Sequence, residues 1–150
     1  MTTPEPISDS ATGWVSDHIR TYVESNGSQG HIWRGMTTLL LVTRGRKSGT
    51  LRRSALIYGE DAGRYLIVAS NGAAKNNPAW YYNLLENPEV DLQVGAEKFR
   101  ATATIASSDE KPRLWKIMSD IFPTYNDYEK KASREIPLVI LTPVPANSGD

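Results

Sequence analysis

The stretch TTLLLVTRGRKSGTLRRSALIY, residues 37–58, joins two apolar runs through a strongly basic connection. Thr37–Thr43 is rich in apolar and β-branched residues, which is typical of a strand, and the apolar pattern resumes at Ser54–Tyr58. Gly45 and Gly49 supply the permissive backbone that a tight connection needs. We therefore predict two consecutive strands joined by a turn.

The connection itself is the most unusual feature of the chain. Thr43–Arg53 contains no acidic residue and gathers the bases Arg44, Arg46, Lys47, Arg52 and Arg53. The whole chain has 17 Lys and Arg against 17 Asp and Glu, so a generally basic surface does not explain this cluster. A local excess of cations in a neutral protein predicts a binding site for a ligand with several negative charges.

Length and composition limit the classes of function. A chain of 150 residues fits one domain, which we expect over residues 9–150 after a flexible arm at 1–8. The absence of cysteine excludes thiol catalysis and thiolate metal sites, so a redox function requires a bound cofactor. The N-terminus shows no secretory pattern, and no stretch approaches the roughly 18 apolar residues of a membrane span. We expect a cytoplasmic protein without stable membrane insertion, and peripheral contact with a membrane stays open.

The remaining periodicity predicts helices packed outside a mostly antiparallel sheet. Apolar residues recur at helical spacing from about Asp9 to Ser25 and from about Ser108 to Ile121, the second helix being capped by Asp109 or a neighbouring serine. Further strands are expected at Arg64–Ser70, Val90–Val94, Phe99–Ile105 and Ile136–Leu141. About six strands joined by short turns indicate an α+β fold, an antiparallel barrel with peripheral helices.

A second informative stretch is VASNGAAKNNPAWYYNLLENP, residues 68–88. A strand leads into Ser70–Gly72, and a helix is expected to start with Asn77 as its N-cap and Pro78 at its first position. Backbone N–H groups at both places can bind an anion or the carbonyl of a planar heterocycle. The alternative is a structural helix with Trp80 in the core.

Three blocks of sequence stand in a specific order between about Leu39 and Pro143. They are Gly45–Gly49 with Arg52, then Ala69–Gly72 with Asn77–Tyr81, Asn83 and Asn87–Pro88, then Phe122–Tyr128 with Ile136–Pro137. In this order they resemble the deazaflavin-dependent nitroreductase family of actinobacterial type, which includes F420H2-dependent quinone reductases. The resemblance implies a split β-barrel that binds coenzyme F420 in a groove, with a quinone-like or nitro acceptor over the exposed face of its ring.

The resemblance also assigns the basic turn to the anionic end of F420, a phosphodiester followed by glutamates. Arg46, Lys47 and Arg52 occupy the family's anchoring positions, and Ser54–Ile57 with Ala69–Asn71 line the deazaflavin. The cofactor-binding residues implied in this way are Arg46, Lys47, Ser48, Gly49, Thr50, Leu51, Arg52, Ser54, Ala55, Leu56, Ile57, Val68, Ala69, Ser70, Asn71, Asn77, Pro78, Ala79, Trp80, Asn83 and Tyr125.

Catalytic roles follow from the same resemblance. It places Tyr125 and Tyr128 on the acceptor side, and Ser70 is a second candidate for a hydrogen bond to the acceptor oxygen. A tyrosine with its ordinary pKa near 10 can donate such a bond and pass on a proton afterwards. The alternative is that the two tyrosines, three residues apart, only pack one face of a helix.

Three positions depart from the nitroimidazole-activating member of that family. Phe122 and Ile57 stand where that relative has tyrosines, and Asn71 stands where it has lysine. These differences argue against reduction of nitroimidazole prodrugs. Lys75 or Arg53 could replace the missing lysine in binding the tail.

Other classes of function remain as alternatives. A non-catalytic F420 or flavin binding protein, an FMN-dependent oxidase and a nucleic-acid-binding module would each use the basic turn. A net charge of zero argues against nucleic acid. The isolated His18 and His31 predict no metal site. We expect a small-molecule acceptor as the partner, and a monomer or weak dimer.

Overall fold

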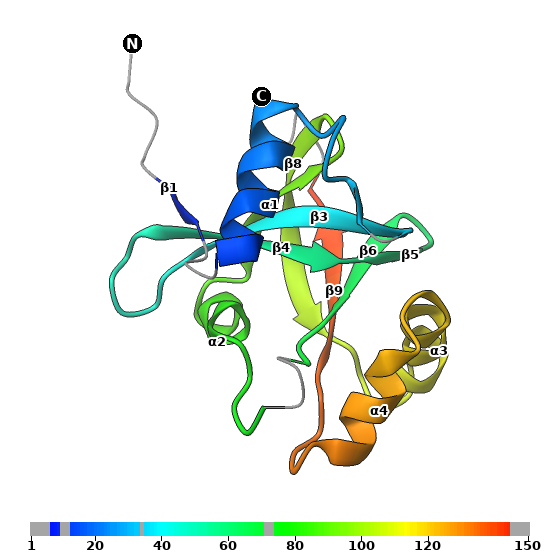
Figure 1. The fold of residues 1–150 in the computed structure, drawn as a ribbon. Coiled ribbons are helices and arrows are strands. Elements are labelled where there is room, and N and C mark those ends of the chain that lie inside the picture. The colour runs from blue at the N-terminus through cyan, green and yellow to red at the C-terminus, as the bar shows by residue number, and fades with distance from the viewer. Residues whose placement is uncertain (1–6, 10–12, 34, 71–73, 145–150) are drawn as a thin grey trace.

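The computed structural model describes residues 7–9, 13–33, 35–70 and 74–144 (Figure 1). Within them lie the helices α1 (Gly13–Glu24), α2 (Ala79–Glu86), α3 (Lys111–Ile121) and α4 (Thr124–Lys131). The strands in the same residues are β1 (Ile7–Asp9), β2 (Ile32–Trp33), β3 (Met36–Arg44), β4 (Leu51–Ile57), β5 (Gly59–Asp61), β6 (Arg64–Val68), β7 (Glu89–Val94), β8 (Glu97–Ile105) and β9 (Leu138–Pro143). None of the helices described here has both the length and the apolar character needed to cross a bilayer.

The described strands form one nine-stranded sheet with the order β1-β4-β3-β7-β8-β9-β6-β5, and β2 pairs with β3 beside this path. Their pairs are antiparallel except for β1 with β4, which run parallel. The sheet curls between its two ends, β1 and β5, without joining them (Figure 1). The predicted antiparallel, barrel-like sheet with peripheral helices is therefore confirmed, with more strands than the six expected.

The β3–β4 hairpin confirms the strand, basic turn and strand predicted from residues 37–58. Its register pairs Arg44 with Leu51, so Arg52 and Arg53 lie within β4 and not in the turn. The loop closes on itself, because the Gly45 N–H donates to the Thr50 carbonyl at 2.7 Å and the Gly49 N–H to the Gly45 carbonyl at 2.8 Å. This short connection brings several cations close together at one end of the sheet.

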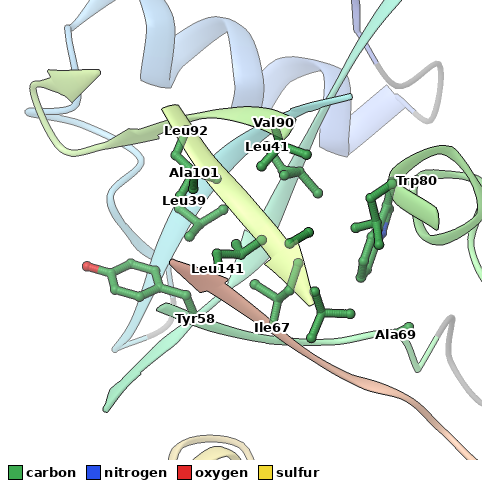
Figure 2. Close-up of a cluster of buried hydrophobic side chains, with 13 residues drawn as sticks. Leu39, Leu41, Tyr58, Ile67, Ala69, Trp80, Val90, Leu92, Ala101 and Leu141 are labelled. Atoms are coloured by element: carbon green, nitrogen blue, oxygen red, sulfur yellow. The ribbon is translucent and has the colours of Figure 1, made fainter. Parts of the chain in front are cut away.

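The inner face of the curled sheet carries the main core (Figure 2). Alternate residues of β3, β7, β8 and β9 point inward, since neighbouring side chains of a strand face opposite ways. These inward-pointing side chains pack with Ile67 of β6 and Trp80 of α2. They belong to Leu39, Leu41, Val90, Leu92, Ala101, Ala103, Val139 and Leu141. Trp80 lies at the α2 end of this cluster, and the Tyr58 ring lies at the other end with its hydroxyl pointing outward (Figure 2). The core therefore runs up to α2 and supports it.

Helix α1 packs on the other face of β3, where Ile19 and Tyr22 contact Leu40. The Tyr22 hydroxyl donates to the Thr38 carbonyl at 3.0 Å and accepts from the Gly95 N–H at 2.7 Å. Just beyond the helix, Gly27 has φ +84, and a Cβ atom there would lie 2.1 Å from the carbonyl carbon of Gly95. The end of α1 and the β7–β8 turn are therefore in backbone contact. The predicted amphipathic helix over 9–25 is confirmed at Gly13–Glu24.

Helices α3 and α4 lie side by side against β6 and β9 (Figure 1). Their buried side chains Leu114, Trp115, Met118 and Tyr125 pack against Leu66, Leu138 and Ile140. The Trp115 Nε1 donates to Asn126 Oδ1 at 2.8 Å and so fixes α4 against α3.

The helix starts differ from the prediction. Helix α2 begins at Ala79 with Pro78 as its N-cap residue, and no side chain caps it. The prediction of Asn77 as N-cap is therefore wrong, because its side-chain oxygen instead accepts from Arg134 Nη1. Helix α3 begins at Lys111 with Glu110 as its N-cap residue, so Asp109 is not the cap. A neighbouring serine, the other predicted candidate, bonds just before the helix, where Ser107 Oγ accepts from the Glu110 N–H at 3.3 Å.

The structure describes only the last two residues of the arm predicted at 1–8. Ile7 and Ser8, expected to belong to the flexible arm, form part of β1 and pair with Leu51 and Arg52. Residues 1–6 lie outside the described residues. A single domain over 9–150 stays a prediction.

Candidate functional site

A cavity of about 330 Å³ opens beside the β3–β4 loop. Its lining comes from four segments that the fold brings together, namely β1, the loop, the first half of β4 and the start of α2. The lining residues are Asp9, Gly45, Arg46, Lys47, Ser48, Arg52, Arg53, Ser54, Ala79, Trp80 and Asn83. In Figure 1 the loop extends from the sheet between β1 and α2. The basic turn and the helix of the second informative stretch therefore face one space.

Asn83 connects α2 to the basic loop. Its side chain is buried, and its Oδ1 accepts from the Arg46 backbone N–H at 3.2 Å and from Arg46 Nη1 at 3.1 Å. Its Nδ2 donates to Thr43 Oγ1 at 3.2 Å. The Arg46 guanidinium also lies over the Tyr82 ring, 5.1 Å from its centre, in a cation–π contact. Arg46 is thus positioned by α2, and the predicted site residue Asn83 fixes the loop.

The cavity carries an excess of positive charge. Arg46, Lys47, Arg52 and Arg53 line it with one acid among the described lining residues, Asp9, which gives a formal charge of +3. Arg53 Nε donates to Asp9 Oδ1 at 2.6 Å. Lys47 and Arg52 form no ion pair with any acid in the described part of the chain. These two cations line the cavity and are suited to pair with an anionic ligand.

The hydroxyls of the loop bond to each other. Ser48 Oγ lies 2.8 Å from Thr50 Oγ1, and it accepts from the Thr50 N–H at 3.2 Å. Ser48 lines the cavity, whereas Gly49, Thr50 and Leu51 of the predicted set do not. Leu51 instead lines a separate hollow on the β7–β8 side with Arg44 and other residues.

The predicted ring-lining residues separate into two groups. Ser54 lines the cavity with Ala79 and Trp80. The other residues of this set pack within the barrel. Leu56 and Ala69 belong to the main core, Ala55 lies beneath α1, and Ile57 and Val68 lie beneath α3 and α4. Val68 and Ala69 are buried, whereas Ala55, Leu56 and Ile57 are half-buried, and the roles of all five toward a cofactor stay predictions.

Arg134, which the sequence analysis missed, organises the segment between β6 and α2. Its Nη2 donates to the Ser70 carbonyl at 2.8 Å and to the Ala69 carbonyl at 3.3 Å. Its Nε donates to the Ala74 carbonyl at 3.0 Å, and its Nη1 donates to Asn77 Oδ1. One guanidinium thus bonds to both described sides of the predicted Ser70–Asn77 segment. Asn71 lies outside the described residues.

The predicted catalytic tyrosines belong to an aromatic cluster on α3 and α4. Tyr125 is buried, and its ring centre lies 5.0 Å from that of Phe122, 6.5 Å from that of Tyr128 and 6.3 Å from that of Trp115. Burial, followed by the nearby Tyr128, raises the pKa of Tyr125 well above its ordinary value. The hydroxyl is protonated at neutral pH, as that of an ordinary tyrosine is, and the raised pKa makes loss of its proton harder. Neither tyrosine lines the basic cavity.

The chain thus combines a curled, mostly antiparallel sheet with a basic cavity beside the β3–β4 loop. A family model described as F420H(2)-dependent quinone reductase matches residues 14–143, most of the chain. The chain belongs to this family of F420-dependent oxidoreductases, which confirms the resemblance read from the three sequence blocks.

Curated relatives agree with the family. An F420H(2)-dependent quinone reductase of Mycobacterium tuberculosis (strain ATCC 25618 / H37Rv) is 39% identical over 129 residues, 83% of this chain and 87% of the relative. A second relative, from Mycobacterium bovis (strain ATCC BAA-935 / AF2122/97) and named as a putative F420H(2)-dependent quinone reductase, matches with the same identity and coverage.

Solved structures agree with the split-barrel fold. The structure of an F420-H2 dependent reductase (FDR-A) matches with a TM-score of 0.64 and 35% identity, covering 69% of this chain and 92% of that one. A structure described as a domain-swapped dimer has a TM-score of 0.68 and 32% identity, covering 88% and 99% of the two chains. The fold expectation of a split β-barrel is therefore confirmed.

Proposed function

We propose that this protein reduces quinones with F420H2 and that the basic cavity binds the anionic end of the cofactor. The observation that carries the proposal is the convergence of Arg46, Lys47, Arg52 and Arg53 on one cavity in a chain of this family. F420 has a phosphodiester and several glutamates at this end, which match a cavity of formal charge +3. The residues present therefore fit the group.

Lys47 and Arg52 are the cations best suited to contact this anion, while Arg46 is oriented by Asn83 and Tyr82. Hydrogen bonds to charged groups contribute about 1.5–3 kcal/mol each, so three give about 4.5–9 kcal/mol. Micromolar affinity requires about 8 kcal/mol net, after several kcal/mol of association cost. Cations alone do not suffice, and contacts with Ala79 and Trp80 at the cavity wall would add to the affinity.

F420H2 supplies a hydride when bound, so the chain's tasks are to orient the acceptor and to bond to its oxygen. Tyr125 is a candidate for the second task, because a tyrosine hydroxyl is protonated at neutral pH and can donate to the acceptor oxygen. The rings of Phe122, Trp115 and Tyr128 restrict the Tyr125 ring, which limits the directions its hydroxyl can take. Ser70 remains the second candidate, and Arg134 fixes its backbone.

We expect quinones, and not nitroimidazoles, to be the preferred acceptors. Phe122 and Ile57 both pack in the apolar cluster with α3 and α4, where the nitroimidazole-activating relative has tyrosines. An apolar wall with fewer hydroxyls suits a flat carbocyclic acceptor better than a polar nitro compound. Turnover of other nitro acceptors, a cytoplasmic location and a monomer or weak dimer stay predictions.

Anaerobic mixing of the protein with F420H2 and menadione tests the proposal. The visible absorbance of oxidised F420 should return at a rate proportional to protein concentration. A parallel mixture with reduced FMN should show no acceleration and so separates this function from an FMN-dependent oxidase. If F420 binds without catalysed reoxidation by any quinone, the protein is a carrier and the proposal is wrong.

A further inference from the structure

Asp9 introduces a negative charge into the cavity that is otherwise basic. It ends β1, which pairs in parallel with β4 and sets Asp9 opposite Arg53. Its Oδ1 accepts from Arg53 Nε at 2.6 Å, and the side chains of Asp9 and Arg53 are 29% and 19% exposed. The pair is thus partly shielded from water. Two charges in such a position interact more strongly than they do at an open surface. Asp9 also lines the cavity itself.

The position of Asp9 matters because the other charged lining residues in the described chain are cations. A carboxylate among Arg46, Lys47, Arg52 and Arg53 lowers the local positive potential. It also repels any further negative charge that enters the cavity. The cost of this repulsion grows with the number of ligand charges that lie within about a Debye length of Asp9, so it is larger for a polyanion than for a ligand with one or two charges.

We propose that Asp9 is a specificity-determining residue that reduces the affinity of the cavity for highly charged ligands and so limits the preferred length of the glutamate tail. This inference depends on the proposed function, because it assumes that F420 binds here. The β1–β4 pairing provides the physical basis, since it fixes the carboxylate at the cavity wall. The residue acts on binding and takes no part in the chemical step.

The test compares Asp9→Asn with Asp17→Asn, a matched control that changes the net charge equally. Asp17 lies on α1 with its side chain 69% exposed and does not line the cavity. Dissociation constants are measured at low salt for F420 with short and long glutamate tails and for the deazaflavin chromophore without phosphate or tail. Thermal unfolding of each variant is recorded in parallel.

For Asp9→Asn we expect about threefold to tenfold tighter binding of long-tail F420, a smaller gain for the short tail and no change for the tail-free chromophore. The gain should shrink at 0.5 M salt, because the Debye length falls to a few ångströms. Asp9→Glu, which keeps the charge, should behave like the unaltered protein, and so should Asp17→Asn.

Equal or weaker binding of long-tail F420 by Asp9→Asn would overturn the inference. Equal gains for all three ligands would also overturn it, because they would indicate a change in shape and not in charge. If the unaltered protein binds none of the F420 forms, the proposed function itself fails. The outcome for Asp9 alone is therefore separable from the outcome for F420 binding.

Discussion

Arg134 and Ser70 are joined by a hydrogen bond of 2.8 Å from the guanidinium Nη2 to the backbone carbonyl oxygen. The bond links the segment before β9 to the end of β6, 64 residues earlier in the chain. The same side chain bonds to Ala69, Ala74 and Asn77. The described residues on both sides of the connection from β6 to α2 are thus bonded to one distant side chain.

Arg134→Ala should lower the free energy of unfolding by about 1–3 kcal/mol, because several carbonyl groups lose a charged donor. It should also slow quinone reduction, since Ser70 is no longer fixed. Arg134→Lys restores the charge but not the planar set of donors, so it should recover only part of both losses. Urea unfolding and anaerobic turnover measure the two effects. Turnover and stability equal to those of the unaltered protein in Arg134→Ala would contradict the assignment.

Lys47→Ala should weaken F420 binding about tenfold, since one charged contact is worth at least about 1.4 kcal/mol. The stability of the fold should not change, because the Lys47 side chain is exposed. Lys98→Ala is the matched control, as Lys98 is an exposed lysine of β8 outside the cavity. Fluorescence titration with F420 gives both dissociation constants. Equal constants for the two variants would refute the anchoring role of Lys47.

Tyr125→Phe should reduce turnover with menadione about tenfold or more while leaving F420 affinity nearly unchanged. The phenyl ring keeps the contacts with Phe122 and Trp115 and removes only the hydroxyl. Tyr65→Phe, in the other aromatic group near Tyr58 and Phe99, is the control. Steady-state kinetics distinguishes the two. Unchanged turnover in Tyr125→Phe would leave this residue with a packing role alone.

Asp61 makes stability depend on acid pH. Hydrogen bonds from Arg113 and then from Arg64 lower its pKa from 3.8 to about 2. Because the folded-state pKa is depressed, the carboxylate contributes stability that is present above about pH 4 and is lost as the pH falls toward 2. Asp61→Asn should therefore be less stable than the unaltered protein at pH 7, and the difference should vanish near pH 2.

Urea unfolding at pH 2, 3, 4 and 7 measures this effect. Arg113→Ala should show a reduced dependence in the same range, because it removes the donor with the largest influence on Asp61. Parallel stability curves for Asp61→Asn and the unaltered protein from pH 4 to pH 2 would contradict the assignment.

The long strands and the basic hairpin could be predicted from sequence, because their signals are local. The alternation of Val90, Leu92 and Val94 and the run Thr37–Thr43 each extend over enough residues to show a period. Strands β1, β2 and β5 have only two or three residues, too few for any periodicity, and pairing with longer neighbours defines them.

The site could be predicted only where its residues are close in the chain. The cations of the turn were found because they cluster between Thr43 and Arg53. Asp9 and Arg134 were missed because each is an isolated charge whose partners lie 44 or more residues away. The placement of Leu56 and Val68 in packing clusters was likewise not evident, since an apolar strand can face either a ligand or the core.

The backbone contact between Gly27 and Gly95 has a practical consequence for chimeric proteins. Since a Cβ atom at position 27 would overlap the Gly95 carbonyl group, any residue other than glycine at position 27 requires the β7–β8 turn to move. A segment grafted from a homologue in place of α1 and the residues after it therefore has to keep a glycine at this position, or else be exchanged together with its own β7–β8 turn as one cassette.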